Sequence, residues 1–430
     1  MRLHRSYLLA VLLLSAPPLL ACPQDSPQTV PTAPVLHTGV TGFIKASGLD
    51  DPQYVLSFVP VQRLLLGATQ HPLTQPEIAK ALQGTPVTLD DLLRLDLLRK
   101  DHDVYRLNYL LLTVADQETI YRVTARLGAS LADAFRAHQA EFDAIASHYK
   151  TAELRRQLMF DLIAGAALNW GGLALTTELG YRIQPPRHPN GSVYFVHSAE
   201  ARAHLDFQGL YLDSETAPGS QLTFSTFGDD SPRLRGMPDV FEGVETATEA
   251  WRKTPDVYAA LQSEYLALIL LAVDDAGQVM NAIANGADTD ASLAKTLSLP
   301  EERRKGIVNL LTAIGYLTAS NGHYSFGVPV LLETDKPLVD ATLHLSREIM
   351  TTWLQQNYPS MQSELSGLSP MRNGVPFSLA FSEVWHYTFG FAAKSLAERG
   401  FYANPHAPGN RYEGYVPLVW ANSVLKGPGN

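Results

Sequence analysis

The chain has 430 residues, of which 46% are hydrophobic, and its 33 basic and 43 acidic residues give a formal net charge of −10. This length and hydrophobic content are sufficient for two domains with their own cores. The negative charge argues against nucleic acid and anionic lipid headgroups as partners. The single cysteine, Cys22, excludes disulfide bonds within the chain and metal sites built from several thiolates.

The first residues have the pattern of an export signal. Arg2 and Arg5 precede an apolar run over residues 8–14, which is far shorter than the roughly 20 residues that span a bilayer. The sequence Leu-Leu-Ala-Cys ends at Cys22 and resembles the lipobox of bacterial lipoproteins. We therefore predict a signal peptide over residues 1–21 and lipid attachment at Cys22.

The lipobox implies that the mature chain works outside the cytoplasm, attached to a membrane by its lipid. Pro23 follows the cysteine, where an aspartate would favour the inner membrane, so the resemblance implies the outer membrane or the cell surface. Cleavage removes Arg2 and Arg5 and no acidic residue, which changes the net charge from −10 to −12. Residues 22–49 are predicted to form a proline-rich tether, and no later run is expected to span a membrane.

Folded structure is predicted from residue 50 onward, beginning with a unit of short helices and strands. Thr74 is expected to cap a helix, with Glu77 as its capping-box partner. A helix-turn-helix followed by paired strands is the element order of a winged-helix unit. The predicted elements are a helix over 54–66 with a kink at Pro60, helices over 74–82 and 88–100, and a strand pair over 104–113.

Longer helices are predicted to follow, over residues 116–148 and 151–179. Gly180 comes directly after the second of them and is typical of a helix C′ position. A strand is predicted over residues 193–197. Residues 201–254 are interpreted as a connector with short strands, because strand-like pieces there alternate with Pro, Gly and Asp.

The same pattern is repeated in the second half of the chain. Asn321-Gly322 is the strongest local hairpin signal in the sequence, because both residues tolerate positive φ. The predicted elements are helices over 258–285, 290–297 and 302–314 and a hairpin over 316–328.

Residue identities also recur at a constant spacing of 220 positions. We therefore predict an internal duplication, with units over residues 50–200 and 255–430. The predicted fold class is mainly α with small β-hairpins (α+β), built from tandem winged-helix-like units with long helices. The matching residues are Glu178, Gly180, Pro185, Asn190 and Val196 in the first unit and Glu398, Gly400, Pro405, Asn410 and Val416 in the second.

The second unit carries the clearer family signature, in residues 293–299, 307–311, 314–317 and 323–326. This pattern resembles the winged-helix domains of ArsR-type regulators and, still more, the N-terminal dimerisation domain of small-molecule O-methyltransferases. The resemblance implies helix packing between units and a possible homodimer. A glycine-rich S-adenosylmethionine loop is missing downstream, so methyltransferase activity is not implied.

DNA binding is an alternative that depends on the signal peptide being misassigned. In the first unit the predicted recognition helix spans residues 88–100. Together with Asp101, which follows it, this helix carries more acidic than basic groups, and DNA phosphates would repel it. In the second unit Arg303, Arg304 and Lys305 stand near a helix start, but Glu301 and Glu302 adjoin them. We therefore expect no nucleic-acid partner.

The usual enzymatic and metal-binding motifs are absent, so no catalytic residue, metal or cofactor is predicted. Glu383 and His386 share a helix face at i, i+3 spacing, as in di-iron bundles, but the other required ligands are missing. With Tyr387 and His406 they are the candidate ligand-binding residues, near an aromatic cluster that core packing also explains.

The predicted function is a non-enzymatic binding or structural role in the cell envelope, for a lipoprotein whose partner is an envelope protein or a small ligand. An enzyme with its site in the C-terminal aromatic pocket is the first alternative. A winged-helix DNA-binding regulator is the second.

Overall fold

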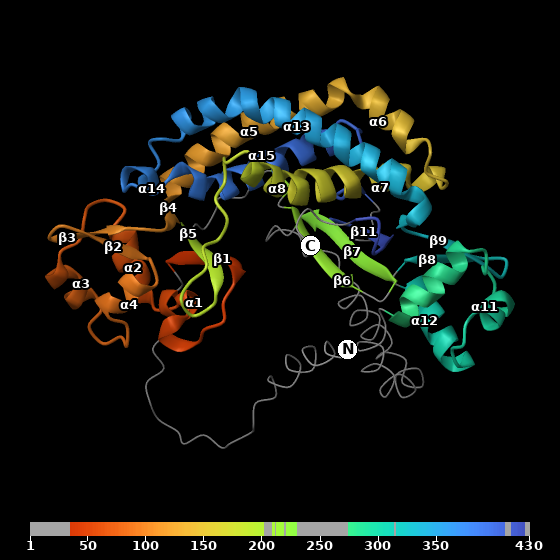
Figure 1. Cartoon of the computed structure of the whole chain (residues 1–430), viewed down its shortest axis with the longest axis horizontal. Helices are drawn as coiled ribbons and strands as arrows, with labels where there is room; N and C mark the ends of the chain where they lie inside the picture. Colours follow the sequence, from red (N-terminus) through yellow and green to blue (C-terminus); the bar gives the residue numbers. More distant parts are fainter. Residues whose placement is uncertain are drawn as a thin grey trace, which may run out of the picture. The chain divides into compact units, whose positions relative to one another are not determined.

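The computed structural model describes residues 35–201, 209–210, 212–218, 221–229, 274–313, 315–408 and 414–425. Residues from Val35 onward belong to one compact unit (Figure 1). The predicted signal peptide lies outside the described residues, as do the start of the tether and most of the predicted connector and of the helix over 258–285. The predicted mixed α+β class, with two winged-helix-like units and long helices, is confirmed.

The first winged-helix-like unit is built from short capped helices and one hairpin. Thr74 caps its helix in a capping box with Glu77, as predicted. Its apolar core gathers Val61, Ile78 and Leu92, each at most 1% exposed. The elements are η1 (Gly48–Asp50), α1 (Pro52–Leu56), α2 (Val59–Gly67), α3 (Gln75–Ala81), α4 (Leu89–Arg94), β2 (Leu98–Asp101) and β3 (Val104–Leu107).

Two of the predicted helices in this unit are wrong in extent. The segment 54–66 forms two helices instead of one, because Pro60 stands in the first turn of α2, where a missing N–H is tolerated. The helix predicted over 88–100 ends at Arg94. Asp96 then takes a positive φ of 57°, which turns the chain so that β2 pairs with β3.

The second winged-helix-like unit repeats this arrangement. Its hairpin turns at Asn321 and Gly322, whose φ values of 52° and 79° confirm the predicted tight turn. In the first unit the amide of Tyr105 donates to the carbonyl of Leu73, and in the second the amide of Tyr324 donates to that of Asp288. The elements are the helical residues 274–284, α11 (Asp290–Thr296), α12 (Glu301–Ala313), β8 (Leu317–Ser320) and β9 (His323–Phe326).

Long helices follow each unit and pack across the duplication (Figure 1). The first long helix of each half packs on the second long helix of the other half: α5 on α15, and α13 on η3. The helices are α5 (Val114–Ala137), α6 (Gln139–Ala146), η2 (Ala152–Leu154), α7 (Arg155–Phe160), η3 (Asp161–Gly171), α8 (Gly172–Glu178), η4 (Glu333–Asp335), α13 (Lys336–Glu364), α14 (Ser369–Arg372) and α15 (Phe377–Glu398).

Each half also contributes a small sheet of the same design. In the first, β5 is parallel to β4 and antiparallel to β1; in the second, β11 is parallel to β10 and antiparallel to β7. Strand β1 lies within the predicted tether and β7 within the predicted connector, so both repeats begin earlier than predicted. The strands are β1 (Leu36–Phe43), β4 (Leu110–Leu112), β5 (Val193–Glu200), β6 (Leu212–Pro218), β7 (Leu222–Asp229), β10 (Val330–Leu331) and β11 (Tyr415–Ala421), in the orders β1-β5-β4 and β10-β11-β7-β6.

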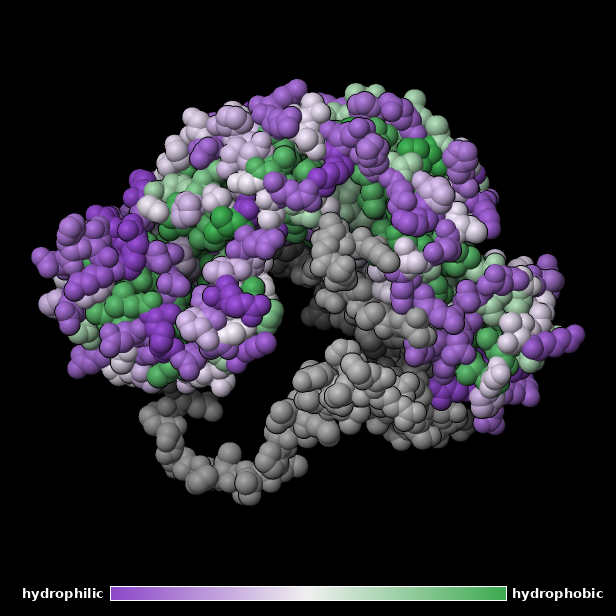
Figure 2. All heavy atoms as spheres, viewed as in Figure 1, coloured by the Kyte–Doolittle hydropathy of each residue, from purple (hydrophilic) through white to green (hydrophobic). Residues whose placement is uncertain are grey.

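One helical stretch, Ala152–Glu178, is long and apolar enough to cross a membrane. The expectation that no segment after Cys22 would have this length and composition is therefore wrong. Within its most apolar window 78% of the residues are buried inside the fold, as in the core helix of a globular protein. On the face shown in Figure 2, hydrophilic residues cover much of the long helices and of both winged-helix-like units.

Candidate functional site

The predicted pair of Glu383 and His386 on α15 has separate partners. Glu383 is 7% exposed, and its Oε1 lies 3.3 Å from Nδ1 of His197 on β5. The Nδ1 of His386 lies 2.8 Å from the carbonyl oxygen of Ser382. The Glu383–His197 contact therefore joins a helix of the second half to a strand of the first.

His197 is a residue that the sequence did not single out, because it stands in no motif. Its imidazole lies directly over Gly39 of β1, where an added Cβ would be 2.3 Å from Nε2. A glycine at this register position leaves room for the ring, which then reaches Glu383.

Tyr387 and His406 contact other parts of the molecule. Tyr387 packs edge-on against Tyr121 of α5, with 4.7 Å between ring centroids. The His406 amide donates to Asn404 Oδ1, and its ring lies against Gly414. Glu383, His386 and Tyr387 lie within about one turn of α15, and His406 lies on a separate segment. Most of the surrounding aromatic cluster is core: Trp385, Phe389 and Tyr402 are fully buried.

The Glu383–His197 pair is expected to stabilise the packing of the two halves. In a double-mutant cycle with Glu383→Gln and His197→Gln, we expect a coupling free energy of about 1 kcal/mol in denaturant unfolding, because the carboxylate is shielded from water. Arg126 and Glu364 form an exposed pair that also joins the halves and is the matched control, with an expected coupling of a few tenths of a kcal/mol. Equal couplings in the two cycles would contradict the expectation.

No cluster of three or more metal-ligating side chains occurs among the described residues.

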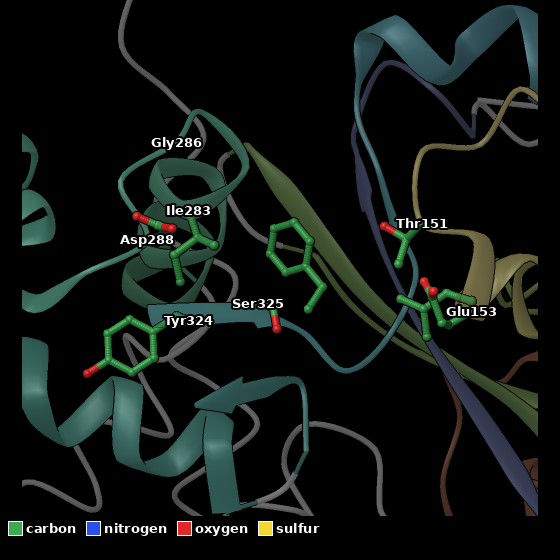
Figure 3. Close-up of a pocket in the computed structure, with 9 residues that line it drawn as sticks. Thr151, Glu153, Ile283, Gly286, Asp288, Tyr324 and Ser325 are labelled. Carbon is green, nitrogen blue, oxygen red and sulfur yellow. The ribbon is translucent and has the colours of Figure 1, made fainter. Parts of the chain in front are cut away.

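One pocket, of about 560 Å³, lies between the first half and the second winged-helix-like unit. Figure 3 shows Thr151 and Glu153 on one wall and Ile283, Asp288 and Tyr324 on the other. Asp288 accepts a hydrogen bond from His323, which lowers the pKa of its carboxyl group. Because that acid is already paired, the pocket offers mainly Glu153 as an available charged group.

The helix η3 has π-type hydrogen bonding over Asp161–Gly171, a form that is rare and is often found at functional sites. The indole of Trp385 lies against it: a Cβ on Gly172 would be 2.6 Å from the ring, and Trp385 Nε1 donates to the Leu168 carbonyl over 3.0 Å. An aromatic side chain from the second half thus supports the unusual helix of the first.

Asp161, the first residue of η3, is fully buried. Neither of its carboxylate oxygens has a hydrogen-bond partner within the part of the chain that the structure describes. Burial raises its pKa well above the usual value, because the charged carboxylate is disfavoured away from water.

A second pocket, of about 440 Å³, lies at the other end of this helix. Trp170, Leu173, Ala174, Thr177 and Glu178 line it at helical spacing, and Arg182 and Gln184 complete it from the following loop. Burial lowers the pKa of the Arg182 guanidinium. This pocket, which we call the Arg182 pocket, places a cation beside apolar and aromatic surface.

The basic residues of α12 are paired or buried in the second winged-helix-like unit. Arg303 pairs with Asp275, Lys305 pairs with Glu301 and Arg304 is 7% exposed. In the first unit the basic residue of α4, Arg94, pairs with Asp50 and Asp91. These side chains are therefore poorly placed to contact phosphates.

No protein-family model matches this chain, and comparison with curated proteins and with solved structures finds no match either. The resemblance to ArsR-type and O-methyltransferase winged-helix domains therefore stays a prediction from the sequence.

Proposed function

We propose that this chain is a lipid-anchored protein of the cell envelope whose role is to bind a small ligand or another envelope protein, without catalysis. The observation that carries the proposal is the sequence Leu-Leu-Ala-Cys at Cys22, placed after a short apolar run and before a proline-rich segment. The lipid is the membrane partner in this proposal, and the outer membrane or the cell surface is the location.

Two features of the fold favour binding over DNA regulation. The basic groups at α4 and α12 are paired or buried, whereas DNA affinity depends on several cations that are free to neutralise phosphates. The pockets of about 560 and 440 Å³ are within the size range of small-molecule sites.

The cross-packing of the long helices also bears on the possible homodimer. The O-methyltransferase unit that the second unit resembles is a dimerisation domain. Here α5 packs on α15 and α13 on η3 within one chain, so the two halves already supply each other's partner helix. We therefore propose that the chain binds its ligand as a monomer.

The lipid anchor is tested by Cys22→Ala in the native host. We expect this variant to incorporate no labelled fatty acid and to leave the membrane fraction, because several acyl chains give effectively permanent anchoring and this variant has none. Gln24→Ala, which leaves the lipobox unchanged, is the matched control and should label and fractionate normally. Unchanged fractionation of Cys22→Ala would reject the anchor and return the DNA-binding alternative to consideration.

A further inference from the structure

Arg182 is fixed in place by neutral groups. Its Nε donates to Thr177 Oγ1 over 3.1 Å and its Nη2 donates to the Leu173 carbonyl over 3.2 Å. Among the described residues no carboxylate pairs with it, and burial alone accounts for its lowered pKa. A partly buried cation that is hydrogen-bonded but not neutralised is an unfavourable arrangement unless an anion joins it.

Among the described residues that line the Arg182 pocket, the one acidic residue, Glu178, is already engaged. Both of its carboxylate oxygens accept from the guanidinium of Arg347 on α13, and this contact lowers the pKa of the Glu178 carboxyl group. Among the described residues, the charge of Glu178 is therefore matched by Arg347, and Arg182 has no carboxylate beside it.

One side of the pocket is formed by apolar side chains on one helix face. Trp170 Nε1 donates to Ser214 Oγ over 2.9 Å, and its ring packs edge-on against Phe227, with 4.9 Å between centroids. Leu173 and Ala174 lie one turn further along the same helix face. A fixed indole and two aliphatic side chains next to a guanidinium match a ligand with an apolar ring and an adjacent oxyanion.

We propose that the Arg182 pocket binds a small organic anion, in which a carboxylate or phosphate group pairs with Arg182 and an attached aromatic or aliphatic group packs on Trp170, Leu173 and Ala174. The planar guanidinium suits either oxyanion, because its N–H groups can donate in pairs. The inference names the ligand class for the binding role proposed above and rests on that role.

An alternative role for Arg182 is purely structural. Its bond to the Leu173 carbonyl, in the first turn of α8, holds the loop after α8 against that helix. The two roles make different predictions, because an arginine with a purely structural role would not favour charged ligands over neutral ones.

The test is isothermal titration of the purified mature chain with phenylacetate, phenyl phosphate and the uncharged phenylacetamide. We expect at least one anion to bind at least tenfold more tightly than phenylacetamide, and the stronger of the two anions identifies the oxyanion. Arg182→Gln should weaken that anion at least tenfold, and Arg182→Lys should retain part of the affinity because the charge remains while the paired donors are lost.

A second variant tests whether any loss of binding comes from the pocket itself rather than from misfolding. Ala174→Phe fills the pocket and keeps both hydrogen bonds of Arg182, so it should abolish anion binding while the circular dichroism spectrum stays unchanged. Equal affinities for phenylacetate and phenylacetamide, binding that survives Ala174→Phe, or no binding of either anion would overturn the proposal. Because the titration does not involve the lipid, its failure is distinguishable from failure of the anchor.

Discussion

The Gly128→Ala variant is expected to lose at least about 2 kcal/mol of its free energy of unfolding, which is typical of overpacking in a rigid core. Gly128 lies on α5 where it crosses α15. A Cβ there would be 2.5 Å from Phe391 Cβ, 2.7 Å from the Thr388 carbonyl oxygen and 2.9 Å from the Ala392 amide nitrogen. Two of these atoms belong to the backbone, so relief requires the two helices to move apart.

The matched control is Gly306→Ala on α12. This glycine is also inside a helix, but a Cβ there has no atom within 4 Å, so the substitution should stabilise the chain by up to about 1 kcal/mol through helix propensity alone. Denaturant unfolding of both variants measures the difference. If Gly128→Ala were as stable as Gly306→Ala, the close approach of α5 to α15 would be refuted.

The contact between Gly128 and α15 matters because long helices of one half pack on long helices of the other half. The helix α5 follows the first winged-helix-like unit and packs on α15, which belongs to the second half. The pairs Glu383–His197 and Arg126–Glu364 cross the same boundary. Loss of the α5–α15 packing is therefore expected to weaken the association of the two halves as well as the local contact at Gly128.

Local chemistry made several elements predictable from the sequence. The capping box at Thr74 and Glu77 and the Asn321-Gly322 turn depend on residues within a few positions of one another. The helix over 88–100 was predicted too long because its leucines are apolar on a helical spacing, while the positive φ of Asp96 depends on how the following strand pairs.

The candidate site was less predictable because its members are distant in sequence. The spacing of Glu383 and His386 places them near each other on α15, but the partner of Glu383 is His197, from a strand of the other half. Arg182 was not identified from the sequence, because its distinguishing feature is that no carboxylate lies beside it among the described residues. Neither relationship leaves a pattern in the sequence of a single chain.

The buried acid of η3 is expected to make the whole chain less stable as pH rises. The pKa of Asp161 is raised by burial in the folded state, whereas an unfolded aspartate titrates near about 3.9. Between these two pKa values the folded chain binds one proton more than the unfolded chain, so the free energy of unfolding falls by about 1.4 kcal/mol per pH unit. This contribution to stability is fully present below the unfolded pKa and is lost as pH rises through the folded pKa.

Asp161→Asn should remove this dependence, since the amide has nearly the same shape and does not titrate. We expect the variant to match the native chain near pH 4 and to exceed its free energy of unfolding by at least about 1.4 kcal/mol at neutral pH, the value of one pKa unit. Denaturant unfolding between pH 4 and 8 measures both slopes. Asp143→Asn, at an exposed position on α6, is the control and should leave the pH slope unchanged. Parallel pH profiles for the native chain and Asp161→Asn would show that Asp161 is ionised in the fold, and that it has a partner or a route to water.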